Sequence, residues 1–459
     1  MGYLMKRFDV IVTGAGTAGC MTAKTAAKAG LNVGLVDRKE KGEIGEKVCG
    51  DACGKHHFDD LGLAYPKGEE LRSRIEGIRI YSPDLQTVFT VKSERLYGFI
   101  LNRLLFGQRL LNDALDAGAT LFESTIATKP IMKDGFVTGI EAKDMKNENT
   151  MRLESKVVAD ASGFTAILRK NLPPQLGIDL HVDNQDVEAC YREIRRLEGE
   201  NFDFKFCEIY LDQTLTPSGY HWIFPEGENR VNVGLGLAMV KGFPNPKKQF
   251  CEKILPKPVF KGSKLIKGGS WYVPTRRPLD CMTGNGIVVV GDSACQVNPI
   301  HGGGIGPSMM GGSLAGKAIA DAVENDDVSR EGLWRYNFDY MRAYGGKQAG
   351  LDVFRMFLLK SVGNEEINYG MKYNLLTEDD LFKASVGEDL HLNISDKTRR
   401  IFRGMGKFSM LMRLRDSANL LKKMKAMYFN YPQSPKDFEK WRRETLAIVK
   451  ETEKRLNRR

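Results

Sequence analysis

The sequence of 459 residues is longer than one hydrophobic core usually supports, so we expect two or three domains. Its 42% apolar and 27% charged residues are ordinary for a globular protein, and no run approaches the roughly 18 apolar residues of a membrane span. Because the first apolar run starts at residue 8, no signal peptide is expected, and we predict a cytoplasmic protein. Eight scattered cysteines without a C-x-x-C pair argue against a metal site.

The net charge of +10 is concentrated near the C-terminus. Residues 396–459 hold nineteen Lys and Arg against seven Asp and Glu, so the rest of the chain is close to neutral. Such a basic segment suits either solvated helix faces or peripheral contact with an anionic membrane, and both interpretations stay open. No nucleic-acid-binding motif accompanies it, so no nucleic-acid partner is expected.

Residues 8–37 have the pattern of a dinucleotide-binding unit. An apolar strand over residues 8–12 leads into a G-x-G-x-x-G turn, a helix over residues 21–29 and a strand over residues 33–36 that ends in an acid. The helix N-terminus is expected to face the phosphates of the nucleotide, and the acid to accept hydrogen bonds from the ribose. The glycines and the acid are Gly14, Gly16, Gly19 and Asp37.

The loop that follows contains Gly45, Gly50 and Gly54, which suit a backbone lying against a flat ligand. Cys49 in this loop is either a small buried residue or an active-site thiol. Cys49 and Cys53 are four residues apart and could meet on a helix as a redox pair.

Further elements follow in chain order. Residues 75–91 alternate as a hairpin with its turn at residues 82–84, and residues 101–117 form a helix that ends at a glycine. Arg103 in the first turn of that helix faces either a phosphate or the solvent. Additional strands are expected over residues 121–127, 136–142 and 157–161, of which the last returns the chain to the nucleotide sheet.

From residue 173 to about residue 274 the sequence changes to short strands and turns, which predict an antiparallel sheet in a second domain. Within it Tyr220, Trp222 and Phe224 alternate, so they share one face of a strand. Three aromatic rings on one face either wall an apolar pocket or belong to the core.

Residues 285–312 are the second informative stretch. An apolar strand over residues 287–290 delivers Asp292, and a glycine-rich segment then leads into a helix through residue 322. A carboxylate there can hold polyol hydroxyls, and the helix N-terminus can stabilise a ring system that becomes anionic on reduction. A flavin needs that stabilisation and nicotinamide does not, so we predict FAD as the cofactor. The chain beyond residue 328 has a helical pattern.

Taken together, these motifs resemble the FAD-binding framework of the aromatic-hydroxylase-like flavoproteins. Residues 47–52, the P-x-x-Y-x-W-x-F-P element of residues 217–225 and residues 273–279 resemble the geranylgeranyl reductases, especially archaeal members that saturate the isoprenoid chains of ether lipids. We therefore expect an α/β protein: a discontinuous Rossmann-like FAD-binding domain (1–74, 98–172 and 280–325), an antiparallel β-rich substrate-binding domain (75–97 and 173–279), and a helical, basic C-terminal region (326–459).

The resemblance also implies roles for individual residues. Cys49, Tyr220 and Trp222 would take part in catalysis. The substrate chain would contact Tyr220, Trp222, Phe224, Pro299 and His301. FAD would contact Gly14, Gly16, Ala18, Gly19, Asp37, Arg38, Cys49, Gly50, Asp51, Arg103, Ala127, Asp292, Gly303, Gly304 and Ile305.

The implied substrate is a geranylgeranyl chain on a diphosphate or a phospholipid, and it sets the chemistry. An isolated alkene is not electrophilic, so hydride transfer to one carbon needs a proton delivered to the other carbon. An aromatic face can stabilise the positive charge that develops on the alkene after the proton arrives and before the hydride does. Cys49 is either the proton donor or a residue that shapes the flavin pocket. No second G-x-G-x-x-G stands in a strand context, so we expect electrons from an iron–sulfur carrier or another small donor.

Two rival functions remain. An FAD monooxygenase or halogenase would share the scaffold, although the W-x-W-x-I-P element of halogenases is matched only in part by residues 220–225. A membrane-surface lipid-binding protein with a structural FAD is the other alternative. The sequence leaves open the headgroup, the number of double bonds reduced and the oligomeric state.

Overall fold

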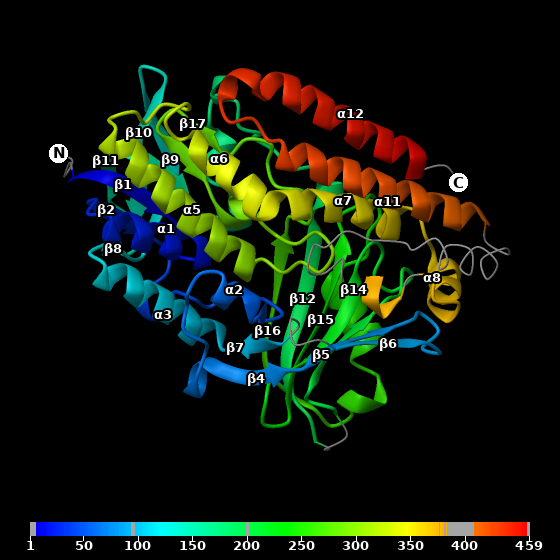
Figure 1. The fold of residues 1–459 in the computed structure, drawn as a ribbon. Helices are drawn as coiled ribbons and strands as arrows, with labels where there is room; N and C mark the ends of the chain where they lie inside the picture. The colour runs from blue at the N-terminus through cyan, green and yellow to red at the C-terminus, as the bar shows by residue number, and fades with distance from the viewer. Residues whose placement is uncertain are drawn as a thin grey trace.

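The computed structural model describes residues 6–92, 97–198, 202–375, 377–380, 382 and 408–456. They form two large β-sheets, one three-stranded sheet and a layer of C-terminal helices (Figure 1). The predicted α/β architecture is confirmed, with a Rossmann-type sheet beside a second sheet.

The first sheet has the order β17–β18–β11–β1–β2–β8, with β10 and β9 continuing from β11 as antiparallel strands. Strand β1 is central, and it pairs in parallel with β2 and β11. Its strands are β1 (Lys6–Thr13), β2 (Val33–Val36), β8 (Thr120–Phe122), β9 (Thr125–Lys133), β10 (Phe136–Asp144), β11 (Thr150–Asp160), β17 (Thr283–Gly284) and β18 (Ile287–Val289).

Helix α1 (Thr17–Lys28) packs on β1 and β2, and it lies between α3 (Arg103–Asp116) and α5 (Ile305–Glu324) (Figure 1). It begins four residues earlier than the sequence predicted, because Gly16 already acts as its N-cap. The early start places its N-terminus directly at the glycine turn.

The second sheet has the order β16–β12–β15–β14–β13–β5–β6. The predicted hairpin over residues 75–91 is confirmed as β5 and β6, but the sheet is not antiparallel throughout, because β5 and β13 run in parallel. These two strands come from distant chain segments, so no tight turn fixes their direction. The strands are β5 (Gly77–Tyr81), β6 (Val88–Lys92), β12 (Glu188–Arg196), β13 (Phe206–Tyr210), β14 (Tyr220–Pro225), β15 (Arg230–Ala238) and β16 (Lys264–Val273).

Two local expectations were wrong. Residues 121–127 are not one strand, because the chain turns between β8 and β9. Ser124 at this turn has a left-handed φ of 47°. Cys49 and Cys53 do not share a helix: Cys53 lies in β3 (Ala52–Gly54), which forms the small sheet with β7 (Gly98–Leu101) and β4 (Leu71–Ile75). Each of these two cysteines is a free thiol.

The predicted helical C-terminal region is confirmed for its described part, whereas residues 383–407 and 457–459 lie outside it. Helices α7 and α11 pack together, and α12 packs on both of them (Figure 1). No helix of the described ranges is long and apolar enough to cross a bilayer. The exact domain limits stay a prediction. The helices are α6 (Trp334–Tyr340), α7 (Gly346–Lys360), α8 (Asn364–Lys372), α11 (Phe408–Phe429) and α12 (Phe438–Leu456).

A buried charge holds this helical layer on the rest of the molecule. Asp280 is 1% exposed and lies just before β17. Its carboxylate pairs with Arg277 at 3.3 Å and accepts a hydrogen bond from the Tyr428 hydroxyl at 3.1 Å. Its carbonyl accepts a hydrogen bond from the Tyr431 hydroxyl at 2.7 Å. Tyr428 lies near the end of α11, and Tyr431 lies in the segment that joins α11 to α12, so one residue links the C-terminal helices to the first sheet.

The substitution Asp280→Asn should therefore destabilise the protein strongly. It leaves the Arg277 guanidinium buried without its counter-charge, which costs about 3–5 kcal/mol in comparable cases. The matched control is Asp339→Asn, which breaks a solvent-exposed pair with Arg335 and should cost about 0.5 kcal/mol or less. Urea unfolding followed by far-UV circular dichroism measures both, and equal losses would contradict the structural role of Asp280.

Candidate active site

One cavity of about 650 Å³ is lined by residues of both large sheets. Its wall runs from the glycine turn after β1, past the loop that contains Cys49, to the aromatic residues of β14 and to the segment that precedes α5. The residues predicted to bind a cofactor and those predicted to bind a substrate therefore face the same space.

The glycine turn leaves one side of this cavity open to a ligand. Gly14 has a φ of 96°, and a Cβ there would lie 2.4 Å from the Ala161 carbonyl oxygen. A Cβ on Gly16 would meet no atom within 4 Å, so the N-cap of α1 is free to receive a group from the cavity. Gly19 has a packing role instead, since its Cβ would lie 1.8 Å from the Gly14 carbonyl oxygen and the residue does not line the cavity.

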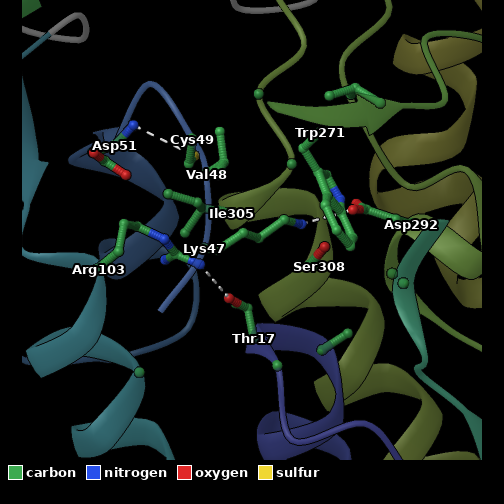
Figure 2. Close-up of a pocket in the computed structure, with 18 of the residues that line it drawn as sticks. Thr17, Lys47, Val48, Cys49, Asp51, Arg103, Trp271, Asp292, Ile305 and Ser308 are labelled. Atoms are coloured by element: carbon green, nitrogen blue, oxygen red, sulfur yellow. Dashed lines mark hydrogen bonds and ion pairs between the residues drawn. The ribbon is translucent and has the colours of Figure 1, made fainter. Parts of the chain in front are cut away.

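Arg103 supplies a positive charge beside that N-terminus (Figure 2). It is the first residue of α3 and only 8% exposed. Its Nη2 donates to the Thr17 hydroxyl at 3.3 Å, while its buried Nε and Nη1 have no hydrogen-bond partner in the structure. A buried guanidinium with unused donors is costly unless an anion binds it, so the turn and Arg103 together fit the diphosphate of FAD.

Two acids predicted to hold hydroxyl groups have protein partners as well. The carboxylate of Asp37 accepts hydrogen bonds from the backbone amides of Ala15 at 2.7 Å and Lys39 at 2.9 Å, which fixes the glycine turn. Asp292 pairs with the Lys47 ammonium at 2.7 Å across the cavity (Figure 2). Both carboxylates line the cavity, so their remaining lone pairs can serve a ligand.

A buried amide connects the Cys49 loop to the aromatic strand. Asn232 Nδ2 donates to the Cys49 carbonyl and to Asp51 Oδ2, at 2.8 Å in both cases, while its Oδ1 accepts from Trp222 Nε1 at 3.1 Å. The Asp51 amide donates to Cys49 Sγ at 3.4 Å (Figure 2). Burial raises the pKa of the Cys49 thiol and raises that of Asp51 to about 6.

The far end of the cavity is largely apolar. Tyr220, Trp222 and Phe224 face it from one side of β14, with successive ring centroids 6.0 and 6.1 Å apart. The Tyr220 hydroxyl donates to the His301 carbonyl oxygen at 2.7 Å, which joins this wall to the loop before α5. The expected aromatic wall is thus present, and its remaining apolar lining is Ile75, Ile78, Cys190, Cys207, Ile209 and Val273.

The three glycines of the Cys49 loop line the cavity, so their contact with a flat ligand stays a prediction, and each of them also packs closely on a neighbouring residue. Gly45 has a φ of 107° and packs tightly on α3. A Cβ on Gly107 of that helix would lie 2.2 Å from the Cα of Gly45. A Cβ on Gly50 would approach the Phe224 ring to 3.1 Å. Gly54 lies against the ring of His56.

The structure brings nearly all the predicted site residues to this cavity. Gly19 and Pro299 are the exceptions among those predicted. The sequence did not identify the lining residues that belong to no recognisable motif. Asn232 could have been noticed only because it is a polar residue in an otherwise apolar strand. The predicted residues that line the cavity are Gly14, Gly16, Ala18, Asp37, Arg38, Cys49, Gly50, Asp51, Arg103, Ala127, Tyr220, Trp222, Phe224, Asp292, His301, Gly303, Gly304 and Ile305, and the missed ones include His56, His57, Glu188, Cys190, Arg192, Trp271, Tyr344 and Lys347.

The Rossmann-type sheet, the open glycine turn and the buried Arg103 with unused donors fit a dinucleotide-binding protein, and the comparisons identify it as an FAD-dependent oxidoreductase. The family model for FAD dependent oxidoreductases matches residues 9–174, and the model for the geranylgeranyl reductase catalytic domain matches residues 186–270. The digeranylgeranylglycerophospholipid reductase of Sulfolobus acidocaldarius is 45% identical over 98% of this chain and 99% of that protein. The chain belongs to the geranylgeranyl reductase family.

A second relative agrees with this assignment, and two solved structures share the fold. The digeranylgeranylglycerophospholipid reductase of Methanothrix thermoacetophila is 34% identical over 81% of this chain and 92% of that protein. The crystal structure of a geranylgeranyl bacteriochlorophyll reductase-like protein from Thermoplasma acidophilum superposes with a TM-score of 0.76 at 23% identity, covering 90% of this chain and all of that chain. A flavin-dependent brominase superposes with a TM-score of 0.62 at 17% identity, covering 97% of this chain and all of that one, which shows a shared fold alone.

Removing the Arg103 guanidinium should weaken FAD binding. A charge-assisted hydrogen bond contributes about 1.5–3 kcal/mol, so Arg103→Met should raise the Kd of the apoprotein for FAD by roughly 10- to 100-fold. Arg109→Met is the control, because Arg109 lies on the same helix but pairs with Glu70 outside the cavity. Titration by quenching of flavin fluorescence measures both, and an unchanged Kd in Arg103→Met would place the diphosphate elsewhere.

Proposed function

We propose that this chain saturates the carbon–carbon double bonds of geranylgeranyl chains on phosphate-bearing lipids, as a step of isoprenoid membrane-lipid biosynthesis. The observation that carries the proposal is that one cavity joins an anion-binding turn suited to FAD to a largely apolar wall suited to a prenyl chain. The name and the 45% identity of the Sulfolobus relative support the same substrate class.

Bound FAD supplies hydride chemistry once it is reduced. The protein binds and orients the reactants: the α1 N-terminus and Arg103 hold the diphosphate, and the apolar lining excludes water from the reacting carbons. Tyr220 and Trp222 line the cavity, and an aromatic face there would stabilise positive charge on an alkene carbon.

A positively charged corner of the cavity suits the headgroup. Lys347 lines this corner with Tyr344, over whose ring its ammonium lies at 5.3 Å, and burial lowers the pKa of Lys347 to about 8. No carboxylate of the described residues lies within ion-pair distance of it. The nearby Nδ1 of His56 is buried without a partner. An anionic phosphate or diphosphate would satisfy both groups.

Cys49 is better suited to shaping the flavin pocket than to donating a proton. Its sulfur accepts the Asp51 amide, and burial raises the pKa of its thiol. A thiol with a raised pKa is a weak acid at neutral pH. These observations favour the pocket-shaping interpretation over the proton-donor one.

The electron donor and the membrane contact are part of the same proposal. An iron–sulfur carrier or another small donor would reduce the flavin, since the sequence has a single nucleotide-binding turn in strand context. Lys440, Arg443, Lys450 and Lys454 are exposed on α12, where they suit peripheral contact with anionic headgroups or with an acidic carrier.

The direct test is anaerobic turnover with varied headgroups. The purified protein is loaded with FAD, reduced with dithionite and mixed with geranylgeranyl diphosphate, a geranylgeranylated glycerophospholipid or geranylgeraniol. The masses of the prenyl chains are then measured by mass spectrometry. We expect mass gains in steps of two hydrogens for the phosphate-bearing substrates. No gain with any of them, together with substrate-dependent oxygen uptake by the reduced protein, would instead support a monooxygenase or halogenase.

Replacing Lys347 should affect headgroup binding selectively. Loss of one charge-assisted contact of about 1.5–3 kcal/mol should raise the KM for a phosphate-bearing substrate by roughly 10- to 100-fold in Lys347→Met, with the KM for geranylgeraniol little changed. Lys317→Met is the control, because Lys317 is exposed on α5 and does not line the cavity. Equal effects on charged and uncharged substrates would contradict the headgroup site.

A further inference from the structure

Glu188 is a buried carboxylic acid that faces the substrate cavity. It is the first residue of β12, lines the cavity and is only 6% exposed. A Cβ on Gly236 of the neighbouring strand β15 would lie 2.8 Å from Glu188 Oε2 and 3.2 Å from Cys190 Sγ. The carboxyl group therefore lies in the space left by the missing side chain of Gly236.

This position explains a glycine pair that belongs to no nucleotide-binding turn. Gly234 and Gly236 lie two residues apart on β15, so they share one face of the sheet. A Cβ on Gly234 would lie 2.5 Å from Trp222 Cζ2, just as one on Gly236 would collide with Glu188. Strand β15 thus leaves room for an aromatic ring and for an acid, and both of them line the cavity.

The surroundings of Glu188 provide no ion pair. Within the described ranges no lysine or arginine nitrogen lies within 4.0 Å of its carboxyl group, and the Thr275 side chain offsets only part of the effect of burial on its pKa. Arg355 on α7 is the cation whose field reaches it, but that guanidinium is bound by Asp352 and Asp186, at 2.8 Å in each case.

The other titratable groups beside Glu188 are Cys190 on its own strand and Tyr220 on β14, and Cys49 lines the same cavity from the loop before β3. All three are neutral at pH 7 because burial raises their pKa values. Burial likewise raises the pKa of Glu188 to about 7, so a large part of the carboxyl group carries its proton at neutral pH.

The competing proton donors of the cavity are weaker candidates. The two thiols are poor acids, and the Tyr220 hydroxyl already donates to the His301 carbonyl. Asp51 has a pKa of about 6, so it is mostly ionised at neutral pH, and its Oδ2 is held by Asn232. Glu188 combines an available proton with the acidity of a carboxyl group.

We propose that Glu188 is the catalytic acid that protonates the double bond, an inference that rests on the proposed function. One alkene carbon takes the proton through the π electron pair, so a C–H bond forms while the Glu188 O–H bond breaks. The hydride, which brings two electrons from the reduced cofactor, forms the second C–H bond at the neighbouring carbon. The products are a saturated bond, an oxidised cofactor and a Glu188 carboxylate, which regains a proton from solvent before the next double bond is reduced.

The variant Glu188→Gln keeps the shape of the side chain and removes the acid. General acid catalysis contributes about 10²–10⁴-fold, so single-turnover reduction in the anaerobically reduced protein should slow by at least about 100-fold. Wild-type turnover should slow as the pH rises through about 7, where the Glu188 proton is lost, and this dependence should be absent from the variant. Glu208→Gln is the matched control, because Glu208 is buried in the same sheet, is bonded by Tyr81 and Tyr210, and does not line the cavity.

Infrared spectroscopy tests the acid without turnover. Burial also raises the pKa of Asp51 to about 6 and that of Glu226 to about 8, so their bands titrate in the same window and must be separated from that of Glu188. Between pH 5 and pH 9 the wild type and Glu208→Gln should lose one protonated-carboxyl band near pH 7 that is missing from Glu188→Gln, and the difference between the spectra identifies it. If the glutamine variant does not fold, Glu188→Asp should keep a titrating band with a slower turnover. Wild-type turnover rate and pH dependence in Glu188→Gln, or a wild-type spectrum without such a band, would overturn the proposal. Failure of the wild type itself to reduce any chain would reject the proposed function instead, while the infrared band would still report on Glu188.

Discussion

The buried side chain of Asn232 holds the two halves of the active site together. Its three hydrogen bonds reach Cys49, Asp51 and Trp222, so one amide fixes both the loop beside the cofactor region and the ring that faces the prenyl chain. All donors and acceptors in this set are buried or half-buried, and each would be costly if left unpaired. The distance between the cofactor loop and the aromatic wall therefore depends on a side chain that need not touch either ligand.

This constraint explains how one cavity can have ends of opposite character. The glycine turn and Arg103 offer unpaired donors for an anion, whereas the wall around Trp222 is apolar. Had each end been built by a separate domain with a mobile interface, a hydride donor and an alkene would not be held in contact. The connections through Asn232, and through the Tyr220 hydroxyl to the loop before α5, keep the two ends at a fixed spacing.

Local sequence patterns were sufficient for the parts of the site that are local in the chain. The glycine turn, Asp37, Arg103 at the start of its helix and the Tyr220 stripe each follow from a periodicity or a fixed spacing. Glu188 and Lys347 could not be found in this way, because each is an ordinary charged residue until strands and helices from distant segments enclose it. The parallel pairing of β5 with β13 was missed for a similar reason, since both strands look the same in either direction.

Reduced flavin and prenyl chain should react within this one cavity, and anaerobic stopped-flow spectroscopy can follow both reactants at once. The protein with reduced FAD is mixed with a geranylgeranylated phospholipid, and the absorbance of oxidised FAD is followed while quenched samples are analysed for saturation. We expect one oxidised FAD to appear for each double bond lost, at the same rate. Flavin that stays reduced in the presence of the lipid until oxygen is admitted would contradict it.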